Sequence, residues 1–153
     1  MNKIIATDSN NYAALIARIA IAITIFPHGA QKLLGWFGGY GFTGTMQFFT
    51  GTVGMPWIIG FLFILIEFFA PLFLLFGLGT RIASLAIIGG FLGVVFSSII
   101  HNGFFMNWSM EGGKGEGLEY FILLFGLAIV SLIAGGGKAS ADSFLTSKNS
   151  SQR

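Results

Sequence analysis

The sequence contains no cysteine and few charged residues. Without cysteine, the chain forms no disulfides, no thiolate metal sites and no CxxC redox pair. Charged residues make up 9% of the 153 residues, whereas a soluble domain carries about 25%. The net charge of +2 comes without a basic cluster, and we expect no nucleic-acid partner. Because 54% of the residues are hydrophobic, lipid must solvate much of this chain.

Long apolar runs predict the architecture, since a helix needs about 20 residues to cross the hydrocarbon core of a bilayer. The expected membrane spans are residues 12–36, 57–78, 81–100 and 118–134. The connections between them differ sharply in length. Four short spans with many small residues predict an all-α, integral membrane four-helix bundle that forms one domain over residues 1–153. Residues 135–153 turn polar, and we expect them to form a cytoplasmic tail. The glycines Gly89, Gly90 and Gly93 predict a close helix contact on the third span.

The distribution of lysine and arginine predicts the orientation, because these residues collect on the cytoplasmic side. With both termini inside, six basic residues lie on the inner side and two on the outer side. The inner set is Lys3, Arg18, Arg81, Lys138, Lys148 and Arg153, and the outer set is Lys32 and Lys114. The sequence therefore predicts a multi-pass protein of the inner (plasma) membrane with cytoplasmic N- and C-termini.

One carboxylate, Glu67, falls near the middle of the second span. An ionised side chain at that depth costs at least about 2–3 kcal/mol unless it is paired or neutralised. By depth, the expected partners are His28 and Arg18 of the first span. His28 and Lys32 are four residues apart and therefore share one helix face.

Further polar residues lie toward the outer ends of the spans, and together with Glu67 they form a candidate site in the outer half of the bundle. The candidates for proton transfer or catalysis are Glu67, His28, His101 and Glu119. The candidates for ligand binding are Arg18, Gln31, Lys32 and Asn102. A purely structural reading stays open for each, because intramembrane charges also lock helices together and headgroup-level polar groups cost little. No metal site is expected, because the two histidines lack the spacing of a ligand pair.

Several segments resemble the DoxX family of small membrane proteins. "LIARIAIAITIFPHGAQKLLG" at 15–35 is similar to its first span, and "IEFFAPLFLLFGLGTRIASLAI" at 66–87 is similar to its second hairpin. "HNGFFMNW" at 101–108 and "GEGLEYFILLFGLAIVSLIAGGGKASAD" at 115–142 resemble the later blocks. Ala139 departs from the pattern, since the family often has a bulkier aromatic residue before the serine of its closing motif.

The resemblance implies a link to quinone chemistry, because DoxX-like proteins include subunits associated with a quinol oxidase and with thiosulfate:quinone oxidoreduction. It also places Arg18, His28, Lys32, Glu67, Arg81, His101 and Glu119 on recurrent family positions. We therefore expect a quinone-interacting accessory subunit of a membrane redox system, with ubiquinone or menaquinone as its cofactor. Its expected partner is a redox protein, and the chain is also a candidate for a homo-oligomer. If it is an enzyme, it acts as a subunit of a quinone-linked oxidoreductase. Two alternatives remain: a non-enzymatic scaffold that anchors a redox partner, and a small-molecule or proton transporter that uses Glu67.

Overall fold

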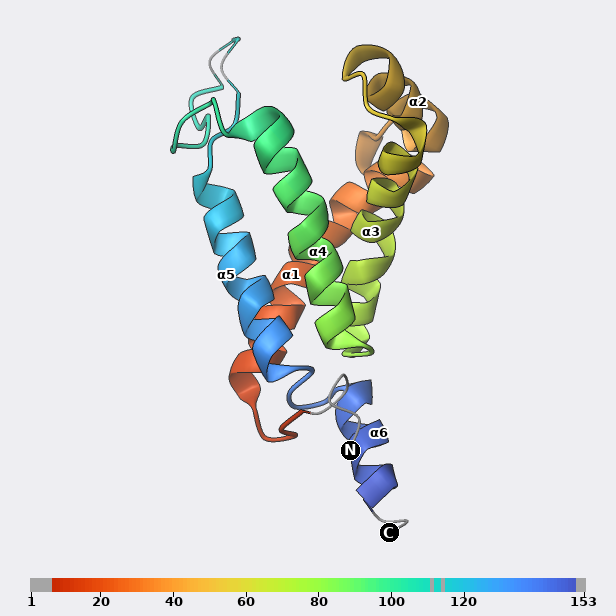
Figure 1. The fold of residues 1–153 in the computed structure, drawn as a ribbon, viewed down its shortest axis with the longest axis vertical. Helices are drawn as coiled ribbons and strands as arrows, with labels where there is room; N and C mark the ends of the chain where they lie inside the picture. The colour runs from red at the N-terminus through yellow and green to blue at the C-terminus, as the bar shows by residue number, and fades with distance from the viewer. Residues whose placement is uncertain (1–6, 111, 114, 151–153) are drawn as a thin grey trace.

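The structure is a computed structural model that describes residues 7–110, 112–113 and 115–150, and these residues form helices and connecting turns without a β-strand. Four apolar helices run roughly along the long axis of the molecule (Figure 1). They are α1 (Tyr12–Leu34), α3 (Trp57–Phe76), α4 (Thr80–Val94), which continues as the π-helical segment η3 (Val95–Ile99), and α5 (Glu119–Ala134). The predicted all-α helical bundle is confirmed.

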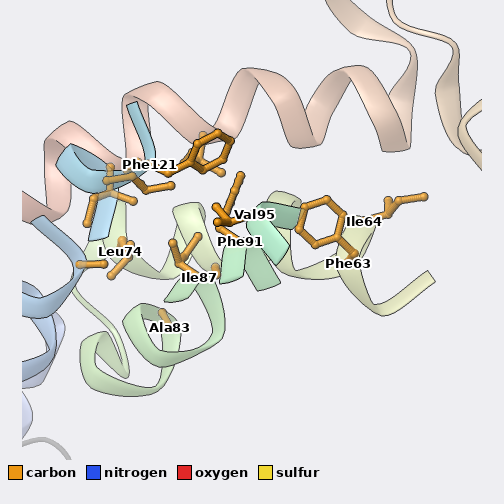
Figure 2. Close-up of a cluster of buried hydrophobic side chains, with 14 of the residues drawn as sticks. Phe63, Ile64, Leu74, Ala83, Ile87, Phe91, Val95 and Phe121 are labelled. Carbon is orange, nitrogen blue, oxygen red and sulfur yellow. The ribbon is translucent and has the colours of Figure 1, made fainter. Parts of the chain in front are cut away.

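The four helices form a ring in which α1 and α4 each contact both α3 and α5. Apolar side chains fill the middle, including Ile21 and Ile25 of α1, Ile64 and Leu74 of α3, and Ile87 of α4, each at most 1% exposed. Figure 2 shows part of this core, with side chains from α3, α4 and α5 in one cluster. α1, α3 and the α4–η3 helix are long and apolar enough to cross a bilayer, and α5 is a shorter apolar helix.

The connections at one end of the bundle are long, and the connection at the other end is tight. The link from α1 to α3 contains η1 (Trp36–Gly38), α2 (Gly41–Gln47) and the π-helical segment η2 (Phe48–Thr52). It lies at the same end of the bundle as the α4–α5 connection (Figure 1). At the opposite end, Gly77 and Gly79 both adopt positive φ angles and turn the chain directly from α3 into α4.

The residues after α5 fold against this tight end, where Arg18 holds them. Its guanidinium donates five hydrogen bonds of 2.6–3.1 Å to backbone carbonyls. The acceptors are Leu74 and Leu75 at the end of α3, and Gly136, Lys138 and Ala139 after α5. The start of the expected polar tail is thus part of the bundle, and it leads into α6 (Ala141–Ser150).

A second anchor on this segment is Asp142, which is 1% exposed. Its carboxylate accepts hydrogen bonds from the backbone N–H groups of Gly79 at 2.8 Å and Thr80 at 2.9 Å. These donors lie at the start of α4, where backbone N–H groups lack partners within the helix. Thr7 also bonds to this region, through Ala134 and Gly137. Both described ends of the chain therefore lie at the same end of the bundle.

Candidate functional site

Helices α1 and α3 lie in very close contact next to Glu67. Gly29 of α1 packs against the α3 backbone so closely that a Cβ atom at Gly29 would lie 2.2 Å from the Glu67 carbonyl oxygen. The close contact expected from the glycines of the third span is in part wrong, because a Cβ atom on Gly89 or Gly93 would meet nothing within 4 Å. The glycine that allows close helix packing is Gly29 on α1, and its contact with α3 brings Glu67 beside the α1 face that carries Lys32.

The Glu67 carboxylate forms an ion pair with Lys32. The Lys32 Nζ atom lies 2.8 Å from Oε2 and 3.1 Å from Oε1 of Glu67. The Glu67 side chain is 3% exposed, while the Lys32 side chain is 26% exposed. The expectation that Glu67 pairs with Arg18 or His28 is therefore wrong. Arg18 lies at the tight end of the bundle, where it binds carbonyls, and Lys32 lies one helical turn beyond His28 on the same face.

This ion pair lines a cavity of about 610 Å³ between the helices, at the end with the long connections. All four apolar helices and both long connections contribute to its wall. The polar lining residues are His28, Lys32, Glu67, Ser97, Ser98, Glu116 and Tyr120. The apolar lining residues are Phe48, Phe49, Val53, Met55, Phe63, Phe91, Val94, Ile99, Met106 and Phe121. A volume in this range with a few convergent polar groups is typical of small-molecule sites.

Phenylalanines from four different elements form a continuous row along the cavity. The ring centroids of Phe49 and Phe63 are 6.2 Å apart, those of Phe63 and Phe91 are 5.6 Å apart, and those of Phe91 and Phe121 are 6.2 Å apart. Figure 2 labels the last three, which meet from α3, α4 and α5. Ring pairs at these distances interact favourably beyond the burial of their area. The rings are tilted by 46–71° relative to one another, and they make one wall of the cavity aromatic and apolar.

The π-helical segments η2 and η3 both lie at this cavity. The η2 segment contributes Phe48 and Phe49, and the η3 segment contributes Ser97, Ser98 and Ile99. Each segment has a hydrogen bond with the wide π spacing, from Val53 N to Phe48 O at 3.0 Å and from Ile100 N to Val95 O at 2.9 Å. π-Helical turns occur frequently at functional sites, because they reorient the side chains that follow.

Of the residues predicted to form the site, the cavity brings together Glu67, His28 and Lys32. His28 lies at the cavity but is exposed. Arg18 does not line the cavity and anchors the tight end instead. His101 is exposed and lies outside the lining residues.

The remaining three predicted residues contact the connections. Gln31 donates to the Phe37 carbonyl at 3.3 Å. Asn102 donates to the carbonyls of Ser98 and Glu116. The Glu119 Oε1 atom accepts from Trp108 Nε1 at 2.8 Å and from the Met106 N–H at 3.2 Å. These contacts fasten the α1–α3 and α4–α5 connections over the open end of the bundle.

Sequence analysis missed Tyr120, which lines the cavity directly after Glu119. A tyrosine near the end of an apolar span usually marks the membrane interface, so its type did not single it out. A signal was available in the helical spacing, because Tyr120 and Phe121 precede Leu124 and Ala128, which are buried in the bundle. The serines Ser97 and Ser98 were missed because π-helical geometry, which turns them toward the cavity, has no clear sequence signature.

The fold and the cavity define a multi-pass membrane protein built as a compact bundle of four apolar helices. The DoxX family model matches residues 13–101, which is more than half of the chain, and the protein therefore belongs to the DoxX family. The matched region includes Arg18, His28, Lys32 and Glu67. No curated protein and no solved structure matches this sequence significantly.

Proposed function

We propose that this protein binds the head group of a membrane quinone in the central cavity and serves as the quinone-interacting subunit of a membrane redox system. The observation that carries the proposal is the combination, on one cavity, of a row of four phenylalanines with the ion pair between Lys32 and the buried Glu67 carboxylate. A quinone head group is flat and apolar on its faces and has acceptor oxygens at its edges. The aromatic wall suits the apolar faces of such a head group, and Lys32 suits its acceptor oxygens.

In this proposal, each polar residue has a role that follows from its chemistry. Lys32 Nζ donates a hydrogen bond to a quinone carbonyl oxygen, and the Tyr120 hydroxyl or the His28 ring offers a second donor. Glu67 orients Lys32. In its protonated form it donates a proton when the quinone is reduced, and its carboxylate accepts a proton when the quinol is oxidised. Electrons come from or go to a partner subunit. Because the cavity lies at the end of the bundle with the long connections, the orientation with cytoplasmic termini would place the site near the outer surface.

The packing between the ion pair and the tight end of the bundle favours a ligand-binding site over a transport path. Toward the tight end lie Ile21, Ile25, Leu74 and Ile87, which are at most 1% exposed. Arg18 and its five carbonyl partners then close the bundle. A transported solute or proton would need a path through this layer. A site open at one end instead suits a ligand that enters and leaves on the same side.

Binding to purified protein in nanodiscs tests the proposal, with ubiquinone and menaquinone as probes and tryptophan quenching as readout. We expect saturable binding of at least one quinone, and a loss of about tenfold or more in affinity for Glu67→Gln and Lys32→Met. His28→Ala is compared with His101→Ala, which removes the same side chain outside the cavity. We expect only the first to weaken binding.

Absence of binding to the wild-type protein would overturn the proposal. Wild-type affinity in all four variants would also overturn it. That result would favour the scaffold alternative, in which the cavity residues are replaceable. A proton or solute flux into liposomes that depends on Glu67 would favour the transporter alternative instead.

A further inference from the structure

A second cavity of about 420 Å³ borders the central one at α5. It is lined by Phe104, Met106, Trp108, Glu119, Tyr120, Ile122 and Leu123. Met106 and Tyr120 line both cavities. Two side chains thus form a shared wall between the ion-pair cavity and this second cavity, which we call the α5 groove.

The α5 groove faces outward from the bundle and is almost entirely apolar. Ile122 is 55% exposed and Leu123 is 70% exposed, and both lie on the outer face of α5. Phe104 is 52% exposed and covers the groove from the α4–α5 connection. In a helix of a membrane bundle, apolar side chains with this exposure face lipid. The groove therefore connects the shared wall with the hydrocarbon region.

The connection that carries Met106 is firmly attached to the start of α5. The backbone N–H groups of Leu118 and Glu119 donate to the carbonyls of Gly103 and Phe104 at 3.1 and 3.0 Å. In return, the Glu119 carboxylate accepts from the Met106 N–H and from Trp108 Nε1. These bonds hold Met106 near Tyr120. Glu119 therefore acts as a positioning residue for the wall that Met106 and Tyr120 form between the two cavities.

A third cavity borders the central cavity at α1 and α2. This cavity of about 650 Å³ is lined by Gln31, Lys32, Gly38, Gly39, Tyr40, Gly44, Thr45, Phe48 and Phe49. It shares Lys32, Phe48 and Phe49 with the central cavity. Its lining includes an amide, a hydroxyl and glycine backbone. The central cavity is thus bordered by a more polar space at α1 and α2 and by an apolar groove at α5.

We propose that the ligand of the central cavity is an amphiphile with a long apolar tail, which leaves the cavity between Met106 and Tyr120 and lies in the α5 groove. The head group lies at the Lys32–Glu67 pair, and the tail extends along Ile122 and Leu123 into the bilayer. This inference rests on the proposed function for the identity of the head group. It adds that the protein distinguishes ligands by their tails and takes them laterally from the membrane.

Binding of two probes in nanodiscs tests the tail path: ubiquinone with a long isoprenoid tail, and the same benzoquinone head group without a tail. Met106→Trp fills the shared wall with a larger side chain. We expect it to weaken binding of the long-tailed probe by about tenfold or more, and by clearly more than it weakens binding of the tailless probe, whose head group also meets Met106 in the central cavity. Met110→Trp is the matched control, since Met110 is 88% exposed on the same connection and lines none of these three cavities.

A second variant guards against a folding effect at the wall. Leu123→Trp fills the groove from the exposed face of α5, and Leu85→Trp is its control on the exposed face of α4, 59% exposed and outside these cavities. We expect only Leu123→Trp to discriminate against the long tail. Equal effects on both probes, or no effect from either groove variant, would overturn the tail path while leaving the proposed function intact. If neither probe binds the wild-type protein, the proposed function itself fails, and the tail path fails with it.

Discussion

Gly29 of α1 lies against the backbone of Glu67 on α3, with no room for a side chain between them. This contact joins the two helices at the level where the Lys32–Glu67 ion pair forms. Close approach at small residues is the usual way in which membrane helices gain packing energy, because lipid provides no hydrophobic driving force between them. The contact is therefore both a packing feature and the element that positions Glu67.

The first prediction concerns this contact. Gly29→Ala places a methyl group 2.2 Å from the Glu67 carbonyl oxygen, and α1 and α3 must separate. We expect the free energy of unfolding to fall by about 1–3 kcal/mol, with weaker ligand binding as a consequence. Gly89→Ala is the matched control, because a Cβ atom there would meet nothing within 4 Å. Thermal unfolding in detergent measures both, and equal melting temperatures for the two variants would contradict the account.

The second prediction concerns the coupling between Lys32 and Glu67. Lys32→Met leaves a carboxylate that is 3% exposed without its cation, and Glu67→Gln leaves the cation without its carboxylate. We expect each single variant to destabilise the protein and the double variant to recover part of the loss. The coupling energy should be on the order of 1–3 kcal/mol. A double-mutant cycle in the same unfolding assay measures it, and strictly additive effects would show that the pair does not interact.

The third prediction concerns Arg18. Its planar guanidinium reaches five carbonyls on two segments, and a lysine ammonium does not reproduce this geometry. We expect Arg18→Lys and Arg18→Met both to loosen the segment after α5. Limited trypsin digestion followed by mass spectrometry measures this, and cleavage after Lys138 should be faster in both variants than in the wild type. Wild-type cleavage rates in Arg18→Lys would show that charge alone suffices there.

The fourth prediction concerns Asp142. Asp142→Ala removes the acceptor of two backbone hydrogen bonds at the start of α4. We expect a loss of about 1–2 kcal/mol in the free energy of unfolding. The control is Asp8→Ala, because the Asp8 carboxylate is exposed and accepts one local bond from the Asn10 N–H. If both variants unfold at the same temperature, Asp142 does not hold the tail to α4.

The helices could be predicted from sequence because each follows from local composition. The predicted ranges 57–78 and 118–134 lie within two residues of α3 and α5 at each end. Pro56 directly precedes α3, and Gly77 ends it. Apolar length and these boundary residues act within a few positions of the chain, so one sequence is enough to place them.

The contacts of the site could be predicted only in part, because they depend on how each helix is rotated. The sequence showed that His28 and Lys32 share a face, but the Gly29 contact decides that Lys32 meets Glu67. Arg18 was expected to reach a carboxylate of the site, yet it binds backbone carbonyls. Because every residue has a carbonyl acceptor, the five carbonyls that bind the Arg18 guanidinium leave no pattern in the sequence.

The location of a bound quinone tests the central proposal most directly. A photoreactive ubiquinone is irradiated with the protein in nanodiscs, and labelled residues are identified by mass spectrometry. We predict labels on the cavity walls, within residues 28–32, 63–67, 97–99 and 116–121, with excess unlabelled ubiquinone suppressing them. The apolar groove between α3 and α4, lined by Leu62, Phe69, Phe73 and Ile82, serves as the reference for contact with bulk lipid. Labels confined to that groove, or unaffected by competition, would contradict a quinone site at Lys32 and Glu67.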